Sequence, residues 1–315
     1  MHRVGFLLSE GFQVMALASQ SVFEYANITA GEAFYSIENH STTGGAVRSS
    51  LGMKIDTRPI TPRTAVDTWI AAGVNDPLTT PTPGDVLAVL RRAGKRARRI
   101  AGICTGGFML AEAGLLANRR ATTHWIYARE MQQRFPDIRV ENDRIFIVDG
   151  PIWTSAGMTA GLDLALAMVE KDLGADIARS IAHKLVMHQR RAGGQSQHSE
   201  MLDLAPKSDR IQNALNYARK NLNRALTVEE LAGEAHLSPR QFSRVFTLET
   251  GQSPAKAVEG LRLEAARLMI EKSRHSLETI AQETGFRDRR HMREAFMRGF
   301  GVPPQEVRRE ARAPG

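Results

Sequence analysis

Cys104 stands where its thiol could do chemistry. Residues 99–108 read as an apolar strand, a tight glycine-rich turn and the start of a helix. This order predicts a sharp bend of the nucleophile-elbow type, with the thiol at the first turn of the helix. A helix N-terminus stabilises negative charge, so it lowers the pKa of a nearby thiol. We therefore expect Cys104 to be modestly activated.

Two further segments supply polar groups that could meet Cys104. Residues 121–125 carry the imidazole of His124, and residues 154–158 form a second glycine turn at a helix start. Helix N-termini that converge at strand ends favour an anionic ligand group such as a carboxylate. The predicted ligand-binding residues are Gln13, Cys104, Thr105, Gly106, His124, Ser155 and Met158.

Other interpretations of these residues stay open. Cys104 could be a catalytic nucleophile or a buried structural cysteine, and His124 could equally be a hydrogen-bonded structural residue. No clustered Cys, His and Asp spacing indicates a metal, and no cofactor is expected.

The last hundred residues carry a different pattern, two helix-turn-helix units at 227–250 and 277–300. Corresponding core positions, such as Phe242 and Met292, are 50 residues apart. Thr227 and Glu230 form a capping-box signature, and Ser238-Pro239 predicts the start of the second helix of the first unit. Two such units can lay two helices into successive major grooves, about 34 Å apart on one face of DNA.

Helical geometry of about 100° per residue separates the faces of these second helices. The apolar positions cluster on one side, and arginine and glutamine, which suit base edges and phosphates, lie on the other. A solvated face is the alternative, but two matched copies favour DNA binding. The predicted DNA-binding residues are Ser238, Arg240, Gln241, Ser243, Arg244, Arg289, Arg290, His291, Arg293 and Glu294.

The elements that must position these residues divide the chain in two. Residues 1–191 alternate strands with helices, which predicts an α/β fold with a mostly parallel sheet covered on both faces. Strands are expected at 3–8, 34–39, 68–73, 99–104, 144–148 and 152–154, and helices at 12–26, 84–95, 105–116, 126–135, 157–173 and 176–190. A polar linker is expected at 192–207 and an all-α domain at 208–315.

Composition fits this division. A chain of 315 residues is long enough for about two domains. Residues 201–315 carry 20 Lys and Arg against 15 Asp and Glu, a basic balance that suits a polyanion. The basic run 91–99 is interpreted as a solvated helix end. A single cysteine and the lack of a long apolar run predict a cytoplasmic protein without a membrane span.

Residues 208–310 resemble the AraC/XylS family of transcription regulators, in turn residues, core positions and spacing. The sequence departs at Arg287, where that family commonly has a small helix-capping residue. The segments around Cys104 and His124 resemble the class I glutamine amidotransferase-like, PfpI-type domain, of flavodoxin-like fold. The pairing of the two resembles the GlxA family of regulators.

The resemblance implies a transcription activator, a homodimer that binds promoter DNA and RNA polymerase. Its effector would be a small amine, amino acid or betaine-like compound. PfpI-type hydrolases usually have His after the cysteine and a glutamate where Gln13 stands, whereas Thr105 follows Cys104 here. These departures indicate a binding site and not an enzyme. The alternatives are a cysteine hydrolase or hydratase tethered to a DNA-binding module, and a ligand-independent regulator whose first domain only dimerises.

Overall fold

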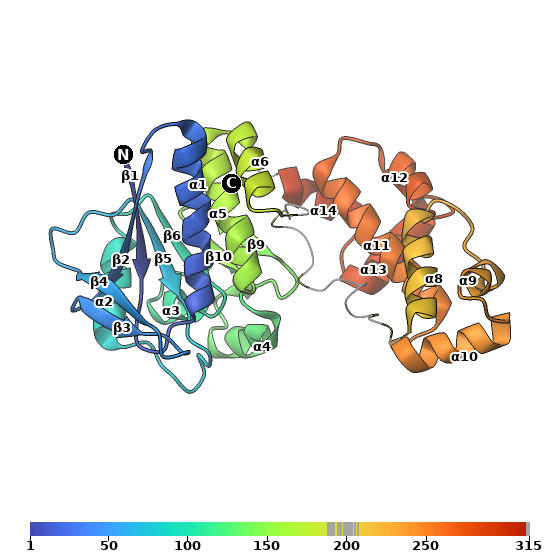
Figure 1. Ribbon diagram of the computed structural model, residues 1–315, viewed down its shortest axis with the longest axis horizontal. Helices are drawn as coiled ribbons and strands as arrows, with labels where there is room; N and C mark the ends of the chain where they lie inside the picture. The colour runs from blue at the N-terminus through green and yellow to red at the C-terminus, as the bar shows by residue number, and fades with distance from the viewer. Residues whose placement is uncertain (188–192, 194–196, 198–203, 205, 207, 313–315) are drawn as a thin grey trace. The chain divides into compact units, whose positions relative to one another are not determined.

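The computed structural model describes residues 1–187, 193, 197, 204, 206 and 208–312, which form two compact units divided after residue 197 (Figure 1). The first unit is α/β and the second is helical. Most of the expected linker, 192–207, lies outside the described residues.

A mostly parallel sheet lies at the centre of the first unit, with eight strands among the described residues in the order β3-β4-β2-β1-β5-β6-β10-β9. The pairs β3–β4 and β9–β10 are antiparallel. The strands are β1 (His2–Leu7), β2 (Tyr35–Ser41), β3 (Gly45–Arg48), β4 (Lys54–Pro59), β5 (Thr68–Ala72), β6 (Arg99–Ile103), β9 (Phe146–Asp149) and β10 (Ile152–Ser155), while β7 (Arg120–Ala121) and β8 (Arg139–Val140) pair separately. The predicted fold class is confirmed.

Helices cover both faces of this sheet (Figure 1). Successive residues of a strand point to opposite faces, so Phe6 and Leu7 of β1 belong to different apolar cores. Phe6 packs in the core that includes α1 (Gln20–Ala30), α5 (Met158–Leu173) and α6 (Ala175–Lys184). Leu7 packs in the core that includes α2 (Gly84–Ala93), α3 (Gly106–Glu112) and α4 (Trp125–Arg134).

One element was missed and two local predictions are wrong. The hairpin of β3 and β4 was not expected, because this sheet edge is polar and largely exposed. The helix predicted at 12–26 begins as a 3-10 helix, Val14–Ser19, before α1. The helix predicted at 176–190 ends at residue 184, and residues 188–190 lie outside the described residues.

A buried ion cluster closes the amino-terminal edge of the sheet. Asp172 of α5 has a fully buried side chain that pairs with Arg98, at 3.0 Å, and with Arg99. It also accepts a 2.8 Å hydrogen bond from the Tyr35 hydroxyl. A buried carboxylate is tolerated only when such partners replace water. Arg99 is therefore a core residue, which corrects the interpretation of the whole 91–99 run as solvated.

The second unit consists of α8 (Asp209–Lys220), α9 (Val228–Glu234), α10 (Pro239–Thr250), α11 (Pro254–Lys272), α12 (Leu277–Glu283), α13 (Arg289–Phe300) and α14 (Pro304–Arg312). The central α11 enters two apolar cores. Its Leu261 packs with the α9–α10 pair, and its Leu263 packs with the α12–α13 pair. None of the helices in the described part of the chain is long and apolar enough to cross a membrane.

Glycine allows α3 to begin in contact with the sheet. A Cβ added to Gly106 would lie 2.3 Å from the carbonyl oxygen of Ala71, in β5. One added to Gly73, just after β5, would lie 2.1 Å from Oγ1 of Thr105. At Gly107 the nearest atom would be the Thr122 carbonyl oxygen at 3.4 Å, an ordinary contact. The turn after β6 can therefore close only with glycine at 73 and 106.

We predict that Gly106→Ala destabilises the first unit, by about 1–3 kcal/mol, because backbone must move to admit the methyl group. Gly107→Ala is the matched control and should be neutral or stabilising, since alanine favours a helix over glycine. Denaturant unfolding followed by tryptophan fluorescence measures both, because Trp69, Trp125 and Trp153 all lie in the first unit. Equal stability of the two variants would contradict the close approach described above.

Candidate functional site

Cys104 occupies the bend that the sequence predicts. Its φ of 56° lies in the left-handed region, which is unfavourable for a residue with a side chain. Three hydrogen bonds hold it there. Its N–H donates to the Ser155 carbonyl at 3.1 Å, and its carbonyl accepts from the Thr123 hydroxyl at 3.0 Å and the Gly107 N–H at 3.3 Å. The bend is thus tied to β10 and to the loop before α4.

The thiol of Cys104 is not activated. The residue is 4% exposed, and this burial raises the pKa of the thiol to about 11, although the Thr105 backbone N–H acts in the opposite direction. The expected lowering of the pKa is wrong, because desolvation of a thiolate outweighs the dipole of the seven-residue α3. Near neutral pH the residue is a small, neutral thiol.

His124 caps α4. Its Nδ1 accepts the Ile126 backbone N–H at 3.4 Å, and its ring stacks on Trp125, with ring centres 5.9 Å apart. A Cβ on Gly157 would lie 3.5 Å from Cδ2 of His124, so the imidazole also adjoins the turn before α5. The hydrogen bond at Nδ1 supports the structural role that was left open for this residue.

Gln13 and Thr105 meet the same segment, residues 73–75, which follows β5. The Gln13 backbone N–H donates to the Gly73 carbonyl, and its side-chain Nε2 donates to Oδ1 of Asn75, each at 2.9 Å. The Thr105 hydroxyl donates to the Val74 carbonyl at 2.5 Å. Gln13 Oε1 is buried and lacks a hydrogen-bond partner among the described residues.

Ser155 and Met158 lie on the other side of the bend. Ser155 is fully buried, and its Oγ has no hydrogen-bond partner within the part of the chain that the structure describes. Met158 is the partly buried first residue of α5. Hydrogen bonds and close approaches therefore link Gln13, Thr105, Gly106 and Ser155 to the surroundings of Cys104, and Met158 takes part in none of those described above.

Tyr127 belongs to this site, although the sequence analysis did not select it. Its hydroxyl donates to the Asn75 carbonyl at 2.9 Å. Burial, followed by the negative charge of Asp76, raises the pKa of this phenol. The available signal was its place one turn into the helix after His124, next to the polar turn at 75–77.

A second set of polar side chains lies on α10. Arg240 and Arg244 are exposed one turn apart and have no ion-pair partner among the described residues. Ser238 and Gln241 form a capping box, in which the Ser238 Oγ accepts the Gln241 N–H and Gln241 Oε1 accepts from Ser238. The Gln241 side chain therefore already takes part in capping α10. Ser243 is half-buried.

The equivalent helix of the second helix-turn-helix unit, α13, differs from α10 because one of its exposed arginines is paired with a glutamate. Arg289 and Arg293 are exposed, while Arg290 pairs with Glu294 at 3.0 Å. His291 is partly buried, and its Nδ1 accepts the Arg287 N–H at 3.3 Å, so it stabilises the turn. Asp288 caps the helix by accepting the His291 N–H at 2.7 Å. The departure expected at Arg287 is thus not a missing cap, because the next residue supplies it.

The comparisons with known proteins match both units. The DJ-1/PfpI family model matches residues 3–171, and a helix-turn-helix domain model matches residues 231–310. The chain is 31% identical to the HTH-type transcriptional regulator GlxA of Rhizobium meliloti (strain 1021), over 99% of this chain and 97% of that protein. The chain belongs to the GlxA family. This GlxA-family protein is a DNA-binding transcription regulator.

An enzyme and a solved structure each match part of this GlxA-family chain. Isonitrile hydratase of Pseudomonas putida is 37% identical over 99 residues, which cover 31% of this chain and 42% of that enzyme. The crystal structure of an AraC family transcriptional regulator from Pseudomonas putida matches with a TM-score of 0.53 at 21% identity, over 59% of this chain and 100% of that one. The structural match supports the fold.

We predict slow modification of Cys104 by thiol reagents. With a pKa of about 11, roughly one thiol in a thousand is ionised at pH 8, against about one in four at the ordinary pKa. Alkylation of the folded chain at pH 8 should therefore be at least about a hundredfold slower than in denaturant, and its rate should rise with pH up to about 11. Rapid, pH-independent alkylation of the folded chain at pH 7 would contradict this assignment.

Proposed function

We propose that the first unit binds a small metabolite at the Cys104 bend, without catalysis, and thereby controls DNA binding and transcription activation by the second unit. The observation that carries this proposal is a strained, precisely anchored bend whose thiol is neutral. A hydrolase or hydratase of this type needs a thiolate and a free base. Here burial keeps Cys104 protonated, and the His124 Nδ1 is used as a helix cap.

The polar groups around the bend favour a ligand that donates hydrogen bonds. Gln13 Oε1 is an acceptor, and Ser155 Oγ can accept or donate; both are buried without partners among the described residues. The rings of His124, Trp125 and Tyr127 pack against one another, and the Tyr127 hydroxyl bonds the same residue, Asn75, as the Gln13 side chain. The acceptors suit an ammonium group, which donates N–H bonds, whereas the aromatic rings suit either an ammonium or a quaternary ammonium group. This chemistry supports an amine, amino acid or betaine-like effector.

Gln197, inside the expected linker, offers a route from this site toward the DNA-binding unit. Its Nε2 donates to the Thr123 carbonyl at 2.9 Å, and its Oε1 accepts the Trp125 N–H at 2.9 Å. Thr123 in turn holds the Cys104 carbonyl. A ligand that shifts the 123–125 loop would therefore change the contacts of the linker. This coupling is how we propose that binding reaches the second unit.

Two recognition helices on one rigid α11 support the DNA-binding mode. A 19-residue helix is about 28 Å long, comparable with one turn of DNA. We propose that α10 and α13 enter successive major grooves, with Arg240 and Arg244 reading guanine and Glu294 suited to cytosine. We further propose a homodimer on promoter DNA that contacts RNA polymerase, which the AraC/XylS resemblance supports.

Arg244→Ala tests the interface. We expect it to weaken binding to the native promoter by about 1–3 kcal/mol, roughly 5–150-fold, if the contact with guanine is bidentate. Arg210→Ala is the matched control, because it removes an exposed arginine of the same unit on α8. Fluorescence anisotropy over a range of salt concentrations measures both. Equal losses in the two variants would show a purely electrostatic role.

Gln197→Ala tests the control of transcription. The effector is first identified by thermal-shift screening of amines, amino acids and betaines on the full chain, since a ligand of the folded state raises the melting temperature. We then expect Gln197→Ala to retain DNA affinity but to lose most of the reporter response. Gln133→Ala, an exposed glutamine on α4, is the control. A normal reporter response of Gln197→Ala would exclude the proposed route.

The enzyme alternative has its own test. Turnover of amides or nitriles by the parent chain that is lost in Cys104→Ser would support a hydrolase or hydratase.

A further inference from the structure

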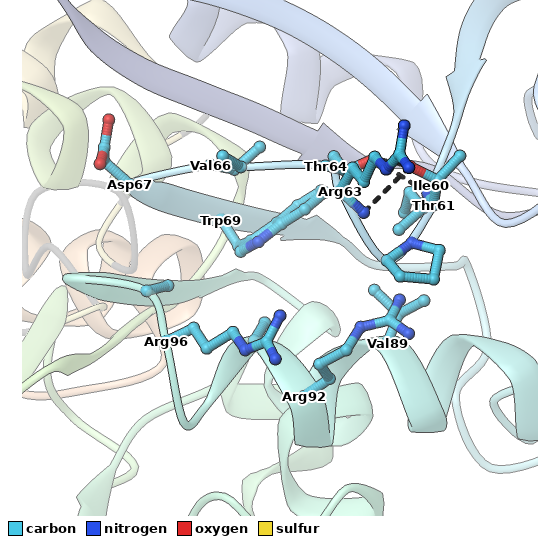
Figure 2. A pocket seen from close by; sticks show the side chains of 14 residues that line it. Ile60, Thr61, Arg63, Thr64, Val66, Asp67, Trp69, Val89, Arg92 and Arg96 are labelled. Atoms are coloured by element: carbon cyan, nitrogen blue, oxygen red, sulfur yellow. Dashed lines mark hydrogen bonds between the residues drawn. The ribbon is translucent and has the colours of Figure 1, made fainter.

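A cavity of about 260 Å³ in the first unit is lined mostly by residues that precede β5 and β6 (Figure 2). The segment 60–67, which leads into β5, forms one wall, and residues 89–97 at the end of α2 form the other. Both walls precede their strands, whereas Cys104 follows β6. The five residues of β6 separate the two places by roughly 16 Å. The cavity is therefore distinct from the proposed effector site.

Three arginines face this cavity. Arg63 comes from the first wall, and Arg92 and Arg96 come from the second, with the two α2-side guanidinium groups lying across from Arg63 in Figure 2. None of the three has an ion-pair partner among the described residues. Asp67 is the acidic residue of the lining, and its carboxylate already accepts the Arg3 backbone N–H at 2.8 Å. The cavity thus has an excess of positive charge that the protein does not neutralise.

The inner surface of the cavity is apolar. Trp69, which is 5% exposed, lies between the two walls, and Val66 and Val89 lie beside it (Figure 2). An indole and aliphatic side chains below a rim of guanidinium groups suit a molecule that is apolar at one end and anionic at the other. Arginine binds carboxylate and phosphate groups through paired hydrogen bonds, so its planar group favours such anions over a simple halide.

We propose that this cavity binds a small organic anion with a flat apolar body and two anionic groups. The apolar body would lie against Trp69, and the anionic groups would pair with Arg92, Arg96 and Arg63. Duplex DNA fits less well, because its phosphates lie on a convex surface and cannot reach the recessed indole. This second site goes beyond the proposed function and does not depend on it.

Isothermal titration calorimetry of the full chain with benzene-1,3-dicarboxylate tests the proposal. We expect binding of this dianion and none of neutral benzamide. Arg92→Gln and Arg96→Gln should each weaken it roughly tenfold or more, because each removes a charge-assisted hydrogen bond. Arg91→Gln is the matched control, an exposed arginine of α2 outside the cavity lining, and should bind as the parent does.

Each other outcome overturns the proposal. No heat of binding at millimolar dianion would exclude the site, and an equal loss in Arg91→Gln would indicate nonspecific attraction. Loss of binding in Cys104→Trp would place the dianion at the bend instead. Weaker binding of nonspecific duplex DNA by the Arg92→Gln and Arg96→Gln variants, without dianion binding by the parent, would show a polyanion surface. Failure of this site would leave the effector proposal unaffected.

Discussion

The close approach of α3 to β5 determines the geometry of the site around Cys104. Because Gly73 and Gly106 carry no side chain, the turn after β6 can close tightly and place Cys104 in a left-handed conformation. Thr105 then reaches the Val74 carbonyl, and the segment 73–75 comes within reach of Gln13 and Tyr127. The site is thus built from backbone contacts first, and the polar side chains gather around them.

The close packing around the bend also determines the protonation state of the Cys104 thiol. A helix start favours negative charge, but the packing that creates the bend also removes water from Cys104, and desolvation is the larger effect. In this chain the bend therefore keeps its strained backbone while its thiol stays protonated. An isonitrile hydratase and transcription regulators are both among the relatives of this chain, so the fold by itself does not distinguish these activities.

Sequence patterns predicted the parallel sheet, the bend and both helix-turn-helix units, because these depend on periodicity, glycine turns and helix caps. They did not predict the sign of the Cys104 pKa shift, since burial comes from segments distant in sequence. The same holds for the partners of Arg99 and Gln197, which lie 73 and 74 residues away. The β3–β4 hairpin was missed because an exposed edge leaves little hydrophobic pattern.

Because α11 packs in both apolar cores of the second unit, its length is difficult to change. Leu261 and Leu263, two residues apart, belong to different cores, so one inserted residue would rotate one core against the other by about 100°. One base pair of added spacing in DNA needs a rotation of only about 35°. In the proposed binding mode, lengthening α11 by one residue would therefore not match a change of one base pair in the spacing of the two DNA contacts. In the proposed binding mode, a change of operator would therefore come from exchanges of side chains on α10 and α13, at a fixed spacing.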